Sequence, residues 1–472
     1  MSEEYERNDE QFASVLEQYE AMIKENRVEF FDLEQFEEIF DHYYAKNKIS
    51  KAEKVLSIAQ DQHPYSSELK MRQAQILMRR KKFEKAIELL EKLLHLEPNN
   101  PDLYLLMAEA CSDKGEMDKA VECYLSALQY MDKEEHDYVY MDIAGEYLSH
   151  SNYQKALEYL EIALDVNPYN DLIYLDILFA TQVLEDVEHA YKLYQKQIEK
   201  DAYNQTAWFY SGIALSDLDR VEEAIEAFDF AIVIDASFTE AYFQKAELYM
   251  AQDDYVQAIS VITELGEDIR HNASANYMLG ECYENLAQWT NALKYYRNAA
   301  QLDPNFSDAW LSIGVITYKL GSFEEALSYV KKALRLEPNN VDAFITLGDI
   351  KKDTGQYDAA FDAYKRAESI DNTVIDLWLN YSDLYVQTGD IESALAMMEE
   401  AVKVLGEIPE LYYRYGAYEY LNGSYLTAYA LIEMAAQMNV EMIHKELFTY
   451  LPELRNNSEI QNIILRIITD EN

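Results

Sequence analysis

Apolar side chains recur at helical spacing through residues 307–340, in two runs that a short turn separates. The first run predicts a helix over about 308–320, and the second predicts a helix over about 323–336. Gly321 suits the turn between them, because the residue that ends a helix often needs a positive φ. Pro338 ends the second helix, since proline lacks the N–H that would continue it. The apolar faces carry Trp310, Ile313, Gly314, Thr317, Phe323, Ala326, Leu327, Val330 and Ala333.

The same pattern repeats along most of the chain. An alanine stands at the place of Ala326 in twelve successive windows, and every interval is 34 residues except one of 36. The place of Phe323 is always bulky and apolar, and the place of Gly314 is small in ten windows, with Phe40 and Leu178 as the departures. The alanines in phase are Ala52, Ala86, Ala120, Ala156, Ala190, Ala224, Ala258, Ala292, Ala326, Ala360, Ala394 and Ala428.

This unit resembles the tetratricopeptide repeat (TPR), whose period is also 34 residues. The resemblance covers about residues 33–442. It implies an all-α fold, a right-handed α-α superhelix of about twelve helix pairs with extra terminal helices. Each repeat of such a solenoid packs mainly on its neighbours, so we expect no single central core.

Three regions are predicted: an acidic segment and capping helix over 1–32, the solenoid over 33–442, and capping helices over 443–472. The N-terminal helix is expected from about Asp9 to Asn26. At the other end, an isoleucine stripe at helical spacing predicts either a capping helix for the last repeat or a dimerisation helix. Its members are Ile460, Ile463, Ile464, Ile467 and Ile468.

Irregularities are expected at three places. The interval of 36 residues puts two extra residues near Asp132–His136, as a loop insertion or a hinge. Windows four to six, residues 137–238, depart furthest from the pattern, so the superhelical twist there is expected to be irregular. In the seventh window, Gly266 falls late in the second helix, which we expect to end early.

The charge restricts the choice of partners. The chain has 40 Lys and Arg against 87 Asp and Glu, a net charge of −47. An acidic surface of this size disfavours nucleic acids and anionic membranes, because binding to phosphates needs basic residues. The acidity serves either solubility or the binding of a basic partner.

The sequence contains none of the common motifs for nucleotide binding, metal-dependent hydrolysis or a serine nucleophile. The eight histidines form no pair with each other or with cysteine at metal-ligand spacing, and the three cysteines are too scattered for a disulfide framework. We therefore expect no enzymatic activity, cofactor or metal. A cytoplasmic location is expected, because no signal peptide and no run of 18 apolar residues is present.

In TPR arrays the first helix of each pair lines a concave groove, and the resemblance implies that this groove binds a peptide. The candidate positions are the fifth, ninth, twelfth and thirteenth residues of each window. The fifth place holds no lysine and the ninth no asparagine, which argues against a clamp for a C-terminal carboxylate.

Two groups of candidate groove residues stand out. The apolar group, in windows four to six, serves either partner binding or packing between helices. It consists of Met141, Leu148, Leu175, Phe179, Val183, Phe209 and Ile213. The acidic group, in windows seven to eleven, serves either to steer a basic segment or simply as a solvated face. It consists of Glu247, Glu281, Glu284, Asp349, Asp353 and Asp383.

The sequence thus predicts a cytoplasmic scaffold or adaptor that holds a protein or peptide segment in its groove, and that segment is basic if the acidity serves binding rather than solubility. Two alternatives remain open: a holdase or assembly chaperone for a basic client, and an accessory subunit of an enzyme encoded elsewhere. Neither the partner nor the oligomeric state can be read from the sequence.

Overall fold

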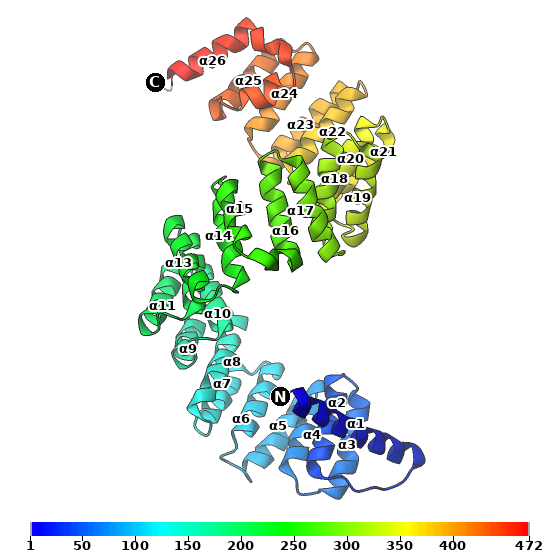
Figure 1. Ribbon diagram of the computed structural model, residues 1–472, viewed down its shortest axis with the longest axis vertical. Coiled ribbons are helices and arrows are strands. Elements are labelled where there is room, and N and C mark those ends of the chain that lie inside the picture. The colour runs from blue at the N-terminus through cyan, green and yellow to red at the C-terminus, as the bar shows by residue number, and fades with distance from the viewer. Residues whose placement is uncertain (1, 471–472) are drawn as a thin grey trace. The chain divides into compact units, whose positions relative to one another are not determined.

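The computed structural model describes residues 2–470, with side chains for 12–266 and 269–468. This part of the chain is helical and contains no strand (Figure 1). Between residues 33 and 438 it forms twelve helix pairs, one for each predicted window. The first helices are α2 (Leu33–Ala45), α4 (Ser67–Arg79), α6 (Pro101–Lys114), α8 (His136–Ser149), α10 (Asp171–Val183), α12 (Gln205–Asp217), α14 (Thr239–Ala251), α16 (Ala273–Asn285), α18 (Ser307–Lys319), α20 (Val341–Asp353), α22 (Ile375–Gln387) and α24 (Pro409–Leu421).

The second helices pack antiparallel to the first. They are α3 (Ile49–Gln62), α5 (Phe83–Leu94), α7 (Met117–Ala127), α9 (Tyr153–Val166), α11 (Val187–Lys200), α13 (Val221–Ile234), α15 (Tyr255–Thr263), α17 (Trp289–Leu302), α19 (Phe323–Leu336), α21 (Tyr357–Ile370), α23 (Ile391–Leu405) and α25 (Tyr425–Met438). The remaining elements are α1 (Ser2–Glu25), α26 (Ser458–Asp470) and the short turns η1 (Lys133–Glu135), η2 (Gly266–His271), η3 (His444–Phe448) and η4 (Pro452–Asn456).

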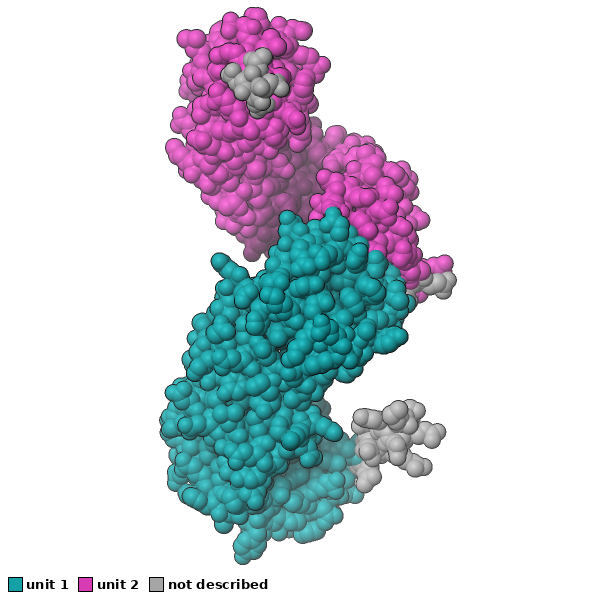
Figure 2. Space-filling view, turned by 90° about the vertical axis from the view of Figure 1, so that its left-hand side faces the viewer, with its two compact units in different colours: residues 1–244 teal, residues 245–472 magenta. Residues whose placement is uncertain are grey.

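The pairs fall into two compact units, residues 1–244 and 245–472, and the boundary lies inside α14 (Figure 2). Within each unit a helix packs on the next one along the chain. The first helices of successive pairs also contact each other; examples are α10 with α12 and α20 with α22. The all-α repeat architecture predicted from the sequence is therefore confirmed.

The in-phase alanines and the small residues opposite them, which together form the alanine seam, explain how the two helices of a pair come close together. All twelve in-phase alanines are fully buried, including Ala326 and Ala360. The small residue of the first helix faces a bulky residue of the second: a Cβ added to Gly348 would lie 2.4 Å from the Tyr364 ring, and one at Gly212 would lie 2.6 Å from Phe228. Only a small residue at this place allows the approach.

The fifth window shows what happens when this place is large. Leu178 stands where every other window except the first, which has Phe40, has Gly, Ala or Ser, and it is buried. In this window α10 and α11 approach each other less closely than α8 does α9 or α12 does α13. A leucine fills the space that a glycine would leave to the facing helix, so the irregularity expected in this region has a steric cause.

Every pair turns through one residue with a left-handed backbone. The φ of this residue is positive in all twelve windows, whether or not it is glycine, as the pattern predicts for Gly321. Non-glycine residues occupy seven of the twelve places, and each adopts a conformation that an L residue rarely takes. The twelve are Asn47, Lys81, Gly115, Ser151, Glu185, Asp219, Asp253, Ala287, Gly321, Gly355, Gly389 and Gly423.

The local irregularities follow the sequence closely. In the seventh window α15 ends at Thr263, ahead of Gly266, and a 3-10 turn replaces its last part, as predicted. The two extra residues of the fourth window extend the connection that contains η1, just before α8. The N-terminal helix begins at Ser2 rather than near Asp9.

Both terminal helices pack on the neighbouring repeat. Val15, Tyr19 and Met22 of α1 join the apolar cluster of the first pair. At the other end Ile460, Ile463 and Ile467 of α26 are buried in one cluster with residues of α24, α25 and η3. Ile464 is partly buried in this cluster, and Ile468 is 45% exposed.

The turn residues give a reciprocal test. Gly321→Ala should destabilise the protein by about 1 kcal/mol, because the left-handed backbone strains an L residue while the added Cβ meets open space. Ala287→Gly, at the equivalent turn, should stabilise it by a smaller amount, because it relieves the same strain while the higher entropy of the unfolded chain offsets part of the gain. Urea unfolding followed by circular dichroism measures both changes. A neutral Gly321→Ala would contradict the assignment of strain.

The isoleucine stripe of α26 gives a second test. Ile463→Ser should destabilise the protein by about 2–4 kcal/mol, because it puts a hydroxyl into a buried apolar site. The matched change Ile468→Ser, at an exposed site, should stay within about 0.5 kcal/mol. Deleting residues 458–472 should expose the apolar cluster and cause aggregation, which size-exclusion chromatography detects. A dimeric wild-type protein with a well-folded monomeric deletion variant would instead favour the dimerisation helix.

Candidate functional site

Helix α10 is apolar on two faces, which is unusual for a helix with a solvent-exposed side. One face is buried and includes Ile173, Tyr174 and Ile177. On the other side lies a stripe of large apolar residues with spacings of three and four, so they share one face along the length of the helix. This α10 stripe consists of Leu172, Leu175, Phe179 and Val183, which are 59%, 49%, 47% and 46% exposed.

The surroundings of Phe179 are open and aromatic. The ring of Tyr153, at the start of α9, meets the ring of Phe179 edge to face, with centroids 6.0 Å apart. Gly145 occupies on α8 the place that Phe179 has on α10; it is exposed, and a Cβ added there would meet nothing within 4 Å. The lack of a side chain at Gly145 leaves α8 bare at this place. The predicted residues Met141 and Leu148 lie on α8 and are half-buried.

The predicted residues on α12 are less exposed. Phe209 is only 9% exposed, and its ring packs against Phe228 and Phe238 at centroid distances of 5.8 and 4.9 Å. Ile213 is half-buried beside the same apolar cluster as Met141 and Leu148. Of the seven apolar candidates, the three on α10 therefore expose the most surface.

Carboxylates accompany the apolar stripe within the same unit. Partial loss of hydration raises the pKa of Asp142 on α8 to about 6, with a further contribution from Glu146, although the side chain keeps an exposed part. Partial loss of hydration also raises the pKa of Glu109 on α6, which is likewise exposed, and of Asp176 on α10, which is half-buried. None of these three forms an ion pair with another described residue. A cation placed beside them would be stabilised by carboxylates that have no counter-charge.

A cavity of about 370 Å³ lies nearer the N-terminal end of the first unit, between α4 and α6. Its lining combines apolar side chains such as Met71 and Leu105 with the carboxylates of Glu37, Glu68 and Glu109 and with one cation, Arg72, which pairs with Asp41 at 2.9 Å. One buried oxygen of Glu37 has no hydrogen-bond partner, and burial raises the pKa of this residue. The cavity is therefore suited to an apolar side chain with a basic end.

In the second unit, four of the predicted acidic residues are held by tyrosines of neighbouring helices. The hydroxyls of Tyr296, Tyr318, Tyr364 and Tyr418 donate to Glu284, Asp353, Asp349 and Asp383 at 2.9, 2.7, 2.5 and 2.5 Å. Asp383 also pairs with Arg414 at 2.5 Å, and Glu284 pairs with Lys319 at 3.2 Å. These carboxylates link helices within the unit, in addition to any contact with a partner.

Glu281 differs from these four. It lines a cavity of about 430 Å³, and burial raises its pKa to about 7, while a hydrogen bond with Tyr277 acts in the opposite direction. The neighbouring carboxylates Glu284, Asp308 and Glu247 raise the pKa further. Glu247 itself is exposed on α14.

Sequence reasoning did not select Leu172, Asp142 or Asp176. They occupy the second and sixth places of their windows, which also lie on the exposed side of the first helix. Reading these two places along with the other four would have found them.

Among the described residues, no group of three or more His, Cys, Asp or Glu side chains is placed to hold a metal ion. No helix in the described part of the chain has the length and apolar character needed to cross a membrane.

Two family models, each described as a tetratricopeptide repeat, match this chain. The first matches residues 77–138 and 352–411, and the second matches residues 38–101, 243–305, 277–341 and 313–373. Together they cover more than half of the sequence. The chain belongs to the tetratricopeptide repeat family, whose members act as scaffolds for protein–protein interaction.

The relatives are distant. The TPR repeat-containing protein YpiA of Bacillus subtilis is 24% identical over 286 residues, 59% of this chain and 65% of that protein. Cell division cycle protein 27 homolog A of Arabidopsis thaliana is 33% identical over 100 residues, 21% of this chain and 14% of that protein. The chain thus spans less than two thirds of the length of these curated relatives. Among solved structures, a chain of the APC/C hetero-tetramer Cut9–Hcn1 has a TM-score of 0.44 and 15% identity, over 87% of this chain and 94% of that one.

The raised pKa of Glu281 predicts a pH-dependent effect of Glu281→Gln. Burial penalises the ionised carboxylate in the folded state, so the variant should be more stable than the wild type above pH 7, by about 1–3 kcal/mol. As the pH falls through 7, the folded wild type takes up a proton and the difference shrinks. It should vanish below the ordinary value of 4.5, where the carboxyl is neutral in both states. Urea unfolding across this pH range measures it, and a difference that does not change with pH would refute the assignment.

Proposed function

We propose that the protein is a non-enzymatic interaction scaffold in the cytoplasm, and that the first unit anchors a segment of a partner protein on the α10 stripe. The observation that carries this proposal is the exposure of Leu172, Leu175, Phe179 and Val183 on one face of one helix. The half of each of these side chains that remains in water contributes nothing to the packing between helices. Contact with a partner would remove them from water, at about 25 cal/mol per Å² of apolar surface before the ordering costs of binding.

The charges around the stripe indicate the chemistry of the partner. Glu109, Asp142 and Asp176 lie on α6, α8 and α10 with raised pKa values and no cationic partner among the described residues. A lysine or arginine beside them would lower these pKa values again, so its binding is favourable. The segment that fits is therefore apolar with basic residues on one side, and its basic residues would act mainly on the rate of association and on specificity.

The free cysteines are compatible with the proposed location. Cys111, Cys123 and Cys282 form no disulfide, as is usual in a reducing compartment.

The test begins with a segment selected from a random peptide library for binding to the wild-type protein. Phe179→Glu with Val183→Glu should raise its Kd by at least about tenfold, because two charges would replace the apolar anchor. The matched control is Leu96→Glu with Val233→Glu, which changes two exposed apolar residues of the same unit that lie off the stripe, 71% and 81% exposed. The control should bind almost as the wild type does.

The proposal is wrong if both double variants bind equally well. A sharp fall in the melting temperature of Phe179→Glu with Val183→Glu would show that these side chains support the fold. In that case Phe179→Ser, a smaller change, decides between the two roles, since it should weaken binding while leaving the fold intact.

The same experiments separate the alternatives. Saturable binding of one class of sequence favours a scaffold or adaptor, whereas suppression of aggregation for many unrelated basic clients favours a holdase or assembly chaperone. Copurification of one enzyme at fixed stoichiometry would favour an accessory subunit.

A further inference from the structure

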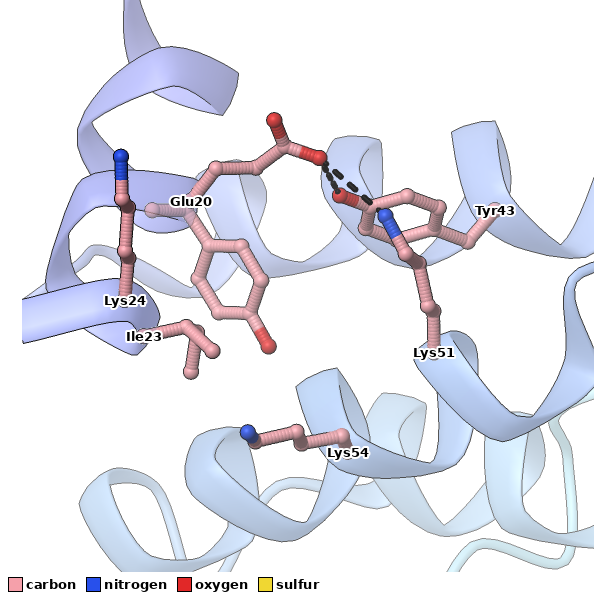
Figure 3. Close-up of a pocket in the computed structure, with 7 residues that line it drawn as sticks. Glu20, Ile23, Lys24, Tyr43, Lys51 and Lys54 are labelled. Carbon is pink, nitrogen blue, oxygen red and sulfur yellow. Dashed lines mark hydrogen bonds and ion pairs between the residues drawn. The ribbon is translucent and has the colours of Figure 1, made fainter. Parts of the chain in front are cut away.

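A lysine-lined cavity lies between the N-terminal helix and the first repeat, away from the α10 stripe. It has a volume of about 380 Å³, and α1 contributes Tyr19, Glu20, Ile23 and Lys24 to its lining. The other lining residues are Tyr43, Lys51 and Lys54, of which the two lysines belong to α3 (Figure 3). Three lysines against one carboxylate make the lining positive, in a chain with 87 acidic and 40 basic residues.

One carboxylate already shows what this cavity can hold. A single oxygen of Glu20 accepts a hydrogen bond from the hydroxyl of Tyr43 at 2.7 Å and another from the ammonium group of Lys51 at 3.3 Å (Figure 3). Lys51 also stands 4.8 Å from the centre of the Tyr43 ring. The hydrogen bonds from Tyr43 and Lys51 lower the pKa of Glu20, as expected for a carboxylate held in its ionised form.

The remaining two lysines have no such partner. Lys24 from α1 and Lys54 from α3 line the same cavity, and neither forms an ion pair with another described residue. α3 also begins here with Lys48 at its N-cap and no acidic residue in its first turn. The positive end of the helix dipole therefore adds to the charge of the lysines. The cavity can hold a second carboxylate in the way it holds that of Glu20.

We propose that this cavity is a second binding site, which takes the Asp and Glu side chains of an acidic segment of a partner protein between Lys24 and Lys54. This second site lies outside the α10 stripe proposed above, and its ligand carries the opposite charge. Its apolar wall, with Ile23 and the ring of Tyr19, contacts the aliphatic parts of the segment.

The lining favours a carboxylate over a phosphate. Phosphate sites commonly use arginine forks or backbone N–H groups of glycine-rich turns. The residues that line this cavity include no arginine and no glycine. Lysine ammonium groups together with a tyrosine hydroxyl are the groups that bind Glu20 here.

The test uses the full chain and a fluorescein-labelled twelve-residue peptide of four Glu-Asp-Leu repeats, followed by fluorescence anisotropy at physiological ionic strength. At this salt concentration carboxylates farther than about 8 Å away are largely screened, so the local lysines dominate. The wild type should bind this peptide and should not bind the uncharged peptide of Gln-Asn-Leu repeats. Inorganic phosphate and ATP serve as competitors.

Lys24→Gln with Lys54→Gln should weaken binding at least about tenfold. The matched control, Lys85→Gln with Lys133→Gln, removes the same charge from exposed lysines of the same unit and should change binding by less than about twofold. Lys24→Glu with Lys54→Glu, which puts two carboxylates in place of the two ammonium groups, should abolish binding of the acidic peptide. Circular dichroism confirms that each variant is folded.

The proposal is overturned if the wild type does not bind the acidic peptide, or if the control pair weakens binding as much as the lysines of the cavity do. Displacement of the peptide by phosphate or ATP at lower concentrations than by unlabelled peptide would assign the cavity to phosphates. Self-association of the wild type that Lys24→Gln with Lys54→Gln abolishes would make a second copy of the chain the occupant. Either result would refute an acidic partner segment.

Discussion

The close approach of two helices across a small residue is the contact on which the rest of this protein depends. In each window an alanine of the second helix is completely buried, and in most windows a small residue of the first helix faces a bulky one of the second. A Cβ added at Gly280 would lie 2.4 Å from the ring of Tyr296, so the space is filled without a gap. Because this contact is made within each pair, every repeat is stabilised locally and the other faces of its helices are free to vary.

This constraint explains which features could be predicted from the sequence. The alanine phase, the positive φ at the turns and the early end of α15 all follow from requirements that one or two residues meet. A left-handed turn needs the same backbone whether the residue is Gly321 or Ala287, so the position in the window predicts it better than the residue type does. These local features can be predicted from the sequence because each depends on residues at a fixed spacing within one window.

The candidate site could be predicted only in part, because exposure depends on side chains from other helices and turns. Phe179 and Phe209 both stand at groove places, yet Phe209 is covered by Phe228 and Phe238 while Phe179 is 47% exposed. The tyrosines that donate hydrogen bonds to the acidic residues could not be predicted from the sequence either. Tyr364 reaches Asp349 from the second helix of its pair, and no spacing rule within one helix shows this hydrogen bond.

The distribution of charge shows where solubility stops being a sufficient explanation. A net charge of −47 keeps copies of the chain apart, and any exposed carboxylate contributes to that effect. Solubility does not account for an apolar stripe along α10, which favours association, or for a cavity that three lysines and only one carboxylate line. Folding does not account for them either, because the buried seam is complete without these side chains. Binding to a partner would explain both features, since neither solubility nor folding does. The two surfaces differ in chemistry: the α10 stripe is apolar with carboxylates nearby, and the cavity between α1 and α3 is basic. A scaffold that holds two dissimilar segments needs such a difference, since two similar surfaces on one chain would compete for the same ligand.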